Sequence, residues 1–371
     1  MDNKILYERY HRQIILPELG EEGQQKLIGA KVLVIGAGGL GCPVLQYLAA
    51  AGIGTIGIVD DDIVSLNNLH RQVLYSVNDI GLSKAERASS ILQKLNPEIS
   101  IIPYNERLIN HNALTLIDAF DVIVDGTDNF STRYLINDAC VMLNKPLVYG
   151  AISQFEGQVS LFGNENTADV NYRDIFPDPP KEGEVLNCAE AGVLGVLPGI
   201  IGIMMANETI KLITGIGEPL INQLLTYNAL TNQVYILNLS ARENTRSLIP
   251  INEEEFLRTD YEWLCKMPVD DAEIDADTFN KMITNKKTDV IDVRELHELP
   301  SVTEFAHSRI PLAQLAENIS MINAENVIAF CQSGKRSLQA AKILNGIFGN
   351  SKKVFSLRGG IVEWKKQQQT V

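Results

Sequence analysis

The feature that most constrains the fold is a glycine-rich segment, Gly36-Ala37-Gly38-Gly39-Leu40-Gly41, which separates an apolar run from a helical pattern. Lys31 to Ile35 predicts a strand, and Pro43 to Ala51 predicts a helix. Glycines let the backbone approach a phosphate, and a helix N-terminus offers free N–H groups to an anion. Asp60 ends the next predicted strand, where a carboxylate can hold ribose hydroxyls. The segment therefore predicts a nucleotide-binding unit.

The first 151 residues alternate between strand and helix patterns. A capping-box sequence, Ser83-Lys84-Ala85-Glu86, starts one of the helices. The strands are expected at residues 31–35, 55–60, 99–103, 121–125 and 147–151. This alternation predicts a parallel sheet with helices on both faces. Residues 157–162 and 223–239 read as antiparallel strands around an apolar helix, so we expect a Rossmann-like, doubly wound mixed α/β sheet.

The pattern changes again in the second half of the chain. Residues 163–190 are polar and rich in Pro and Gly, and we expect them to form a mobile crossover. Charge dominates from about Ser240, and a small α/β unit follows. We therefore expect a nucleotide-binding domain at 1–245, a linker at 246–271 and a second domain at 272–371.

Composition excludes several classes of protein. The formal net charge is -14, and residues 271–371 contribute 13 basic against 12 acidic side chains, so the acidity lies in the front part. Nucleic acids need clustered Lys and Arg, so no nucleic-acid partner is expected. We see neither a secretory leader nor an apolar run long enough to span a membrane, which predicts a cytoplasmic protein. Five widely spaced cysteines argue against a disulfide framework.

The glycine segment taken alone predicts an NAD-dependent oxidoreductase. The stretch Ser65-Leu66-Asn67-Asn68-Leu69-His70-Arg71-Gln72 and Lys84 instead supply amides and cations that suit a triphosphate. Asp128 follows a predicted strand end, where it could coordinate magnesium. Two structural alternatives stay open, because Arg71 and Lys84 could be solvated surface cations and Asp60 could cap a turn.

Several motifs together resemble the MoeB/ThiF/HesA family, which is related to ubiquitin-activating enzymes. They are Arg9-Tyr10-His11-Arg12-Gln13-Ile14, the glycine segment, Asp60, residues 65–72, Lys84, Thr127-Asp128-Asn129 and Asn187-Cys188-Ala189-Glu190-Ala191-Gly192. The resemblance covers most of residues 5 to 245. It implies that ATP and Mg²⁺ are used to adenylate the C-terminal Gly-Gly carboxylate of a ubiquitin-like sulfur carrier such as MoaD or ThiS.

The resemblance also implies roles for individual residues. Arg71, Lys84 and Asp128 are expected to be catalytic, with Asp128 holding magnesium, and Arg12 is expected to reach ATP across a homodimer interface. The residues expected to bind the nucleotide from the same chain are Gly36, Gly38, Gly39, Gly41, Asp60, Asn68, Arg71, Lys84, Asp128 and Asn129.

Many members of this family bind structural zinc through two CxxC pairs, the first in a segment resembling Cys-Tyr-Arg-Cys-Leu-Phe-Pro. Here the aligned stretch is Asn171-Tyr172-Arg173-Asp174-Ile175-Phe176-Pro177, and the chain contains no CxxC. We therefore expect no zinc, and packing must stabilise that region. Cys188 precedes an apolar helical stretch and is a candidate nucleophile, with an inert buried thiol as the alternative. Cys42 and Cys140 fall inside predicted helices and are expected in the core.

The rear domain contains a second candidate site, Cys331-Gln332-Ser333-Gly334-Lys335-Arg336-Ser337, between a strand and a helix. Its backbone N–H groups can face the sulfur, and Lys335 and Arg336 add positive charge that favours a thiolate or persulfide. With Ile291-Asp292-Val293-Arg294-Glu295 and residues 357–364, this loop resembles a rhodanese domain over residues 272–370. That implies sulfur transfer through a Cys331 persulfide.

The rear domain has two other possible interpretations, a phosphatase and a catalytically dead tail. A phosphatase loop has five residues between Cys and Arg, whereas Cys331 and Arg336 enclose four. The segment His307-Ser308-Arg309-Ile310-Pro311-Leu312 departs from the Gly-His-Ile-Pro-Gly-Ala of many rhodaneses, and a catalytically dead tail stays an alternative.

The sequence therefore predicts an adenylyltransferase fused to a sulfurtransferase, in which Cys188 mediates the handover of sulfur. The sequence leaves open the pathway of the carrier, molybdopterin, thiamine or another, and the sulfur source, a cysteine desulfurase or thiosulfate. An NAD-dependent oxidoreductase and a noncatalytic protein with a nucleotide-binding fold are the alternatives.

Overall fold

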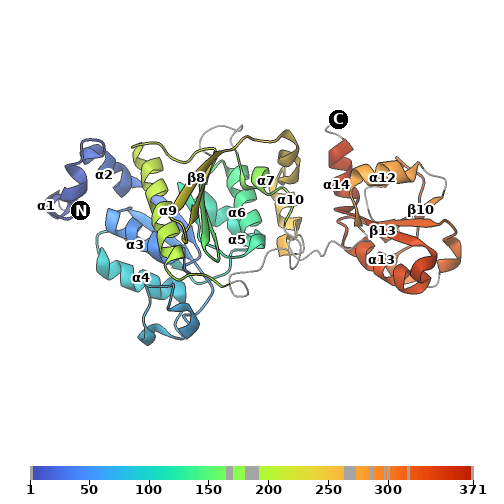
Figure 1. Ribbon diagram of the computed structural model, residues 1–371, viewed down its shortest axis with the longest axis horizontal. Helices are drawn as coiled ribbons and strands as arrows, with labels where there is room; N and C mark the ends of the chain where they lie inside the picture. Colours follow the sequence, from blue (N-terminus) through green and yellow to red (C-terminus); the bar gives the residue numbers. More distant parts are fainter. Residues whose placement is uncertain are drawn as a thin grey trace. The chain divides into compact units, whose positions relative to one another are not determined.

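The structure is a computed structural model that divides into two compact units, Met1–Lys266 and Met267–Val371, called here the front unit and the rear unit (Figure 1). Among the described residues, no helix has the length and apolar character needed to cross a bilayer. The described residues are 3–163, 170–179, 192–262, 273–284, 287–295, 298, 301–315 and 318–368.

The front unit is built on an eight-stranded sheet with the order β3-β2-β1-β4-β5-β6-β7-β8. The first five strands of this order are parallel, and the pairs from β5 to β8 are antiparallel. The sequence prediction of a mixed, Rossmann-like sheet is thus confirmed. The bounds are β1 Lys31–Ile35, β2 Thr55–Val59, β3 Ser100–Tyr104, β4 Val122–Asp125, β5 Leu147–Ser153, β6 Glu156–Phe162, β7 Gln223–Asn228 and β8 Gln233–Asn238.

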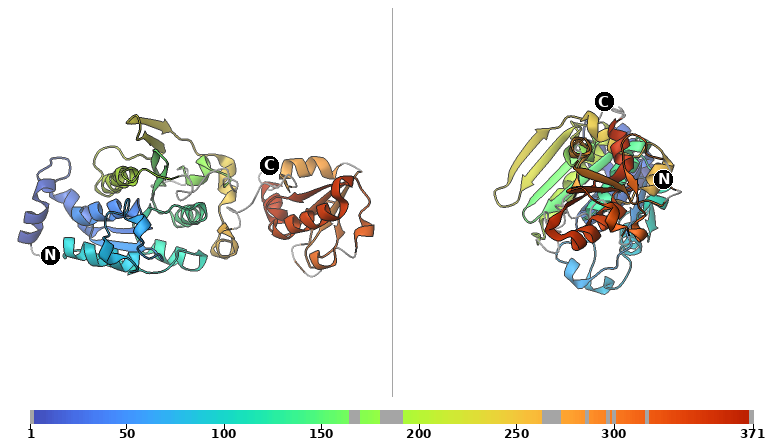
Figure 2. Two further views of the ribbon diagram at one scale, coloured as in Figure 1. Left: turned by 60° about the horizontal axis from the view of Figure 1, so that its bottom comes forward. Right: turned by 90° about the vertical axis from the view of Figure 1, so that its right-hand side faces the viewer.

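Helices cover both faces of this sheet (Figure 2). Val32 and Val34 of β1 belong to one apolar core with α3, α4 and α9, whereas Leu33 and Ile35 belong to a second core with α5 and α6. This division follows from the alternation of side chains along a strand. The bounds are α1 Asn3–Ile14, α2 Gly20–Gly29, α3 Gly41–Ala51, α4 Lys84–Leu95, α5 Asn110–Asp118, α6 Phe130–Leu143, α7 Tyr172–Ile175, α9 Leu197–Thr214 and α10 Glu253–Arg258.

The described part of the expected linker, residues 246–262, belongs to the front unit and contributes to its core. Phe256 of α10 and Tyr261 are buried in the core that contains α5 and α6. Asn110 Nδ2 donates hydrogen bonds to the carbonyl oxygens of Phe256 at 2.6 Å and Thr259 at 2.9 Å. Two aromatic side chains thus anchor this highly charged stretch in the core. The prediction of a linker rested on the charge of the stretch and did not take these aromatic residues into account.

Residues 163–190, the expected crossover, are described only at 163 and 170–179. The described part includes α7, whose N-cap Asn171 accepts a hydrogen bond from the backbone N–H of Arg173. Residues 164–169 and 180–191 lie outside the described residues.

The rear unit contains a five-stranded, all-parallel sheet with the order β11-β10-β12-β13-β9. Its two apolar cores lie on opposite faces, one containing α13 and the other α12 and α14. The expected small α/β unit is confirmed. The bounds are β9 Glu273–Ile274, β10 Thr288–Asp292, β11 Ser308–Arg309, β12 Asn326–Phe330, β13 Lys353–Leu357, α12 Ala276–Ile283, α13 Lys335–Phe348 and α14 Gly360–Gln368.

The short 3-10 helices complete the elements that the structure describes. They are η1 Leu66–Asn68, η2 Val77–Asp79, η3 Glu243–Leu248, η4 Leu312–Gln314, η5 Ile319–Met321 and η6 Gly349–Ser351.

Candidate active sites

The front sheet has a crevice where its strand order reverses, at the carboxyl ends of β1 and β4. Gly36 ends β1 with φ +91°, and a Cβ atom there would lie 2.8 Å from the carbonyl oxygen of Gly126. A Cβ on Gly41 would lie 1.9 Å from the carbonyl oxygen of Gly36. Both positions therefore require glycine, because the loop folds tightly between the strand and α3.

A cleft opens at this crevice, and most of the residues expected to bind the nucleotide line it. They come from the ends of three strands, from the loop after η1 and from the start of α4. The predicted residues in its wall are Gly36, Gly38, Gly39, Asp60, Arg71, Lys84, Asp128 and Asn129. Gly41 and Asn68 do not line the cleft, and Arg12 is exposed on α1. The role expected for Arg12 across a dimer interface stays a prediction.

Asp60 holds the glycine loop from the end of β2. Its Oδ2 accepts a hydrogen bond from the backbone N–H of Ala37 at 2.7 Å, and its Oδ1 accepts one from the backbone N–H of Asp62 at 2.9 Å. Burial raises the pKa of the Asp60 carboxyl above its ordinary value, and the charge of Lys84 opposes that rise. Asp60 therefore caps a turn, which was the structural alternative in the sequence analysis. It also lines the cleft.

Arg71 and Lys84, the two cations predicted to bind the nucleotide from the same chain, differ in their surroundings. Lys84 is 5% exposed, and its Nζ lies 2.8 Å from Oδ2 of the exposed Asp62. The Arg71 guanidinium donates to the carbonyl oxygen of Asn67 at 3.2 Å and lies 3.4 Å from Nε2 of His70. No carboxylate among the described residues pairs with Arg71, so its charge is available to a ligand.

Two side chains that the sequence analysis did not assign to the nucleotide site also line the cleft, Gln72 and Arg133. Both are buried, and within the described residues Gln72 Oε1 and Arg133 Nε have no hydrogen-bond partner. Buried polar atoms without partners are costly, so a ligand in the cleft is expected to satisfy them. Gln72 is the last residue of the 65–72 stretch, and its place in that motif is a sequence signal for nucleotide binding. Arg133 has no such signal in the sequence around it.

Asp128 and Asn129 end the loop after β4, and both are exposed. Asn129 Oδ1 caps α6 by accepting a hydrogen bond from the backbone N–H of Thr132 at 2.9 Å. Among the described residues, no group of three or more His, Cys, Asp or Glu side chains could hold a metal ion. Magnesium is usually bound through one or two carboxylates together with substrate phosphates, and Asp128 in the cleft wall fits that pattern.

Asn171 and Asp174 stand where the family resemblance described above implies the first cysteine pair. Asn171 Nδ2 donates to Asp174 Oδ2 at 2.8 Å, and the Thr245 hydroxyl donates to Asp174 Oδ1. The backbone N–H of Arg242 also donates to Asp174 Oδ1, at 2.9 Å. These groups already bond to one another, and an amide with one carboxylate is a poor donor set for structural zinc.

A buried ion pair lies next to these hydrogen bonds. The Arg173 guanidinium donates to both carboxylate oxygens of Asp138, at 2.8 and 2.7 Å, and the Tyr261 hydroxyl donates to Asp138 Oδ2 at 2.9 Å. The ion pair joins α7 to α6, and the Tyr261 hydroxyl connects both helices to the last described part of the front unit.

The described cysteines, Cys42, Cys140 and Cys331, are all buried free thiols. Cys42 in α3 and Cys140 in α6 are buried core thiols, as predicted. Burial raises the pKa of Cys42 to about 12, which makes it a poor nucleophile. Cys188 and Cys265 lie outside the described residues.

Cys331 follows β12 directly, at the carboxyl edge of the rear sheet and before α13. Its Sγ accepts a hydrogen bond from the backbone N–H of Gly334 at 3.2 Å, and the Ser337 hydroxyl lies 3.6 Å away. Gly334 has φ +91°, which turns the loop back toward the sulfur. The loop can therefore stabilise an anionic sulfur through its backbone.

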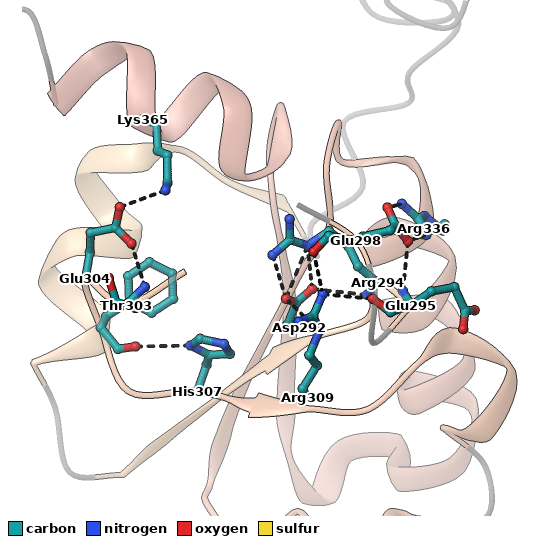
Figure 3. A network of polar contacts seen from close by, with 11 residues as sticks. Asp292, Arg294, Glu295, Glu298, Thr303, Glu304, His307, Arg309, Arg336 and Lys365 are labelled. Carbon is teal, nitrogen blue, oxygen red and sulfur yellow. Dashed lines mark hydrogen bonds and ion pairs between the residues drawn. The ribbon is translucent and has the colours of Figure 1, made fainter. Parts of the chain in front are cut away.

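The positive charge expected from Arg336 is compensated in the structure. Its Nη1 and Nη2 lie 2.5 and 2.7 Å from Oε1 and Oε2 of Glu298 (Figure 3). Glu298 lies 38 residues before Arg336 in the chain, so no local sequence pattern predicts this pairing. The side chain of Lys335 lies outside the described residues.

Family models match both parts of the chain. The model of the ThiF family matches residues 10–248, and the model of the rhodanese-like domain matches residues 275–367.

Curated relatives match over the length of both units. The "Probable adenylyltransferase/sulfurtransferase MoeZ" of Mycobacterium tuberculosis is 41% identical over 97% of this chain and 93% of its own length. The "Adenylyltransferase and sulfurtransferase MOCS3" of Xenopus laevis is 36% identical over 96% of this chain and 85% of its own length. A "Sulfur carrier protein adenylyltransferase" of Thermus thermophilus is 50% identical over 70% of this chain and 96% of its own length.

Solved structures share the fold of the front unit. Escherichia coli MccB with ATP has a TM-score of 0.52 at 25% identity, covering 60% of this chain and 67% of that one. The enzyme class expected from the sequence, an adenylyltransferase with a sulfurtransferase domain, is confirmed by the names of the relatives. On these matches the chain belongs to the ThiF family and carries a rhodanese-like domain after its ThiF domain.

Proposed function

We propose that the front unit uses ATP to adenylate the C-terminal Gly-Gly carboxylate of a ubiquitin-like sulfur carrier, and that the rear unit supplies sulfur for its conversion to a thiocarboxylate. The observation that carries the first half is the convergence of the glycine loop, Arg71, Lys84 and Asp128 on one cleft. A Thermus thermophilus relative is named a sulfur carrier protein adenylyltransferase, which supports the same substrate class.

The chemistry of adenylation explains why several cations, Arg71 and Lys84 among them, line one cleft. A carboxylate oxygen attacks the α-phosphorus of ATP, and pyrophosphate leaves, so two anions must be held together while negative charge moves to the leaving group. The unpaired guanidinium of Arg71 and the buried ammonium of Lys84 are placed to stabilise that charge. Magnesium, which Asp128 would hold, supplies further charge compensation on the phosphates.

The second part of the proposal is that the front unit folds without zinc. It rests on Asn171 and Asp174, which stand where the family resemblance implies zinc-binding cysteines. Asn171 and Asp174 are occupied by hydrogen bonds to each other and to the 242–245 segment. Direct hydrogen bonds therefore join the 171–174 and 242–245 segments without a metal.

In the second half of the reaction, Cys331 accepts a sulfur atom and becomes a persulfide. Its terminal sulfur attacks the acyl carbon of the carrier adenylate, and AMP leaves. A thiolate, for which Cys188 is the candidate from the sequence analysis, then attacks the Cys331 sulfur of this acyl disulfide. The thiocarboxylate leaves, the attacking thiol and Cys331 are joined in a disulfide, and an external thiol reduces that disulfide before the next turnover. The hydrogen bond from Gly334 to Cys331 Sγ supports the anionic sulfur that this step needs.

The test combines the full chain with ATP, Mg²⁺, a Gly-Gly-terminated carrier and a sulfur donor. Mass spectrometry of the carrier should show one carboxylate oxygen replaced by sulfur. Cys331→Ala should stop that replacement while the carrier adenylate still forms. A Cys331→Ala enzyme that still makes the thiocarboxylate would contradict the role given to the rear unit.

A further inference from the structure

Sulfane-sulfur donors differ in charge, and the Cys331 loop carries a charge arrangement that bears on the choice among them. Thiosulfate is a dianion, whereas a cysteine persulfide carries at most one negative charge. A free Arg336 would attract the dianion most strongly. In the structure, however, both Nη atoms of Arg336 bond to the two carboxylate oxygens of Glu298, at 2.5 and 2.7 Å.

Glu298 is fixed in place by contacts other than Arg336. Its Oε1 accepts a hydrogen bond from the backbone N–H of Glu295 at 2.8 Å, and its own N–H donates to the carbonyl oxygen of Glu295 at 3.0 Å. Arg309 Nη2 donates to the carbonyl oxygen of Glu298 at 2.9 Å. Figure 3 shows these side chains gathered around the ion pair. The carboxylate is therefore held for Arg336, unlike the partners in most exposed ion pairs.

The Glu298 carboxylate is ionised at neutral pH. Its hydrogen bond with Arg336 lowers its pKa to about 2. The same hydrogen bond raises the pKa of Arg336, and the nearby charge of Cys331 adds to that rise. Arg336 is the second residue of α13, directly after the Cys331 loop, and its charge is balanced by Glu298.

We propose that Glu298 is a specificity-determining residue, which makes the Cys331 loop favour singly charged sulfane-sulfur donors, such as a cysteine persulfide, over the thiosulfate dianion. The inference rests on the proposed sulfurtransferase role of Cys331. In the step concerned, the Cys331 thiolate attacks the outer sulfur of R–S–S⁻, a new S–S bond forms, and the donor's S–S bond breaks with its electron pair leaving as R–S⁻. Because Glu298 balances Arg336, this ion pair adds no net positive charge that would favour a dianion.

The experiment uses two small donors of similar shape and different charge, thiosulfate and methanethiosulfonate, which carry two and one negative charges. Each transfers one sulfur atom to the Cys331 thiolate, leaving sulfite or methanesulfinate. Glu298→Gln in the full chain removes the charge and keeps the shape of the side chain. It should raise kcat/KM for thiosulfate by about tenfold and for methanethiosulfonate by about threefold, because the first donor carries twice the charge.

Two controls separate charge from structure. Glu295→Gln removes an exposed carboxylate three residues before Glu298, whose oxygens make no described bond to Arg336. This variant should change kcat/KM for either donor by less than twofold. The gain from Glu298→Gln should shrink at high ionic strength, since salt screens charge. If Glu298→Gln changed kcat/KM by the same factor for both donors, or changed it for neither, the proposal would be overturned.

A second measurement keeps the proposal separate from the proposed function. Cys331 is alkylated with iodoacetate and with neutral iodoacetamide, and its modification is followed by peptide mass spectrometry. Glu298→Gln should raise the iodoacetate-to-iodoacetamide rate ratio about threefold, even in an enzyme that transfers no sulfur. An unchanged ratio contradicts the role of Glu298. A Cys331→Ser variant that still turns over either donor contradicts only the proposed function.

Discussion

The nucleotide cleft and the cysteine loop each present an arginine to a candidate site, but only one of the two is compensated. Arg71 bonds to a carbonyl oxygen and lies beside His70, and no carboxylate among the described residues pairs with it. Arg336 has both Nη atoms on the carboxylate of Glu298. An uncompensated cation suits a polyphosphate, whereas a compensated one suits a donor of low charge. The comparison teaches that the partner of an arginine, rather than its presence, decides what its site can bind.

A third arginine extends this comparison to a purely structural case. Arg173 is 4% exposed, and both carboxylate oxygens of Asp138 accept hydrogen bonds from it. Asp138→Ala should lower the free energy of unfolding of the front unit by about 3–5 kcal/mol, because it leaves a buried guanidinium uncompensated. Denaturant unfolding measures this change. Carrier adenylation per folded molecule should stay as in the wild type, and a selective loss of adenylation would place the pair in the chemistry.

The free arginine should show the opposite behaviour. Arg71→Ala should slow adenylation by about 10²- to 10³-fold, since it removes a preorganised donor to developing charge, and it should leave stability nearly unchanged. Single-turnover formation of the carrier adenylate measures the rate. Arg258→Ala is the matched control, because Arg258 is an exposed cation of α10 paired with Glu254. Similar losses for the two variants would remove the distinction between paired and unpaired arginines.

Acid should weaken the compensated pair in a defined pH range. The pKa of Glu298 is lowered to about 2 in the folded chain, so the ion pair contributes stability above the ordinary glutamate pKa of about 4.3. That contribution is lost as the pH falls toward 2. Amide hydrogen exchange of the rear unit should show wild type more protected than Glu298→Gln at pH 6, with a difference that shrinks through this range. A difference that grows in acid would contradict the assigned pair.

The smallest expected effect concerns metal removal. Treatment with a zinc chelator should leave the thermal unfolding temperature of the front unit unchanged. Hydrogen bonds from Asn171 and Thr245 to Asp174 hold this region together in place of a metal. Elemental analysis of the purified chain should find far less than one zinc per molecule. A stoichiometric zinc, or a drop in unfolding temperature after chelation, would contradict the zinc-free proposal.

The sequence was informative where function depends on local pattern. The strand, glycine loop and helix from Lys31 to Ala51 were predicted because side-chain period and glycine placement are local properties. The convergence of Arg71, Lys84 and Asp128 on one cleft was expected from a family resemblance, and the structure brings all three into its wall. Their catalytic roles stay predictions.

The sequence was silent where the partner of a side chain is distant. Glu298 lies 38 residues before Arg336, and Tyr261 lies 123 residues after Asp138. Arg133 reaches the nucleotide cleft from within α6, although nothing near it in the sequence marks it as a ligand. Such contacts depend on the packing of strands and helices, which a single sequence does not specify residue by residue.

The central claim is that the front cleft activates a carrier's terminal carboxylate with ATP. Isotope exchange between labelled pyrophosphate and ATP tests it most directly, since exchange requires reversible formation of an acyl adenylate. The account predicts exchange only when a Gly-Gly-terminated sulfur carrier is present, with Cys331→Ala as active as the wild type. Absence of exchange with every such carrier, or equal exchange without one, would contradict it.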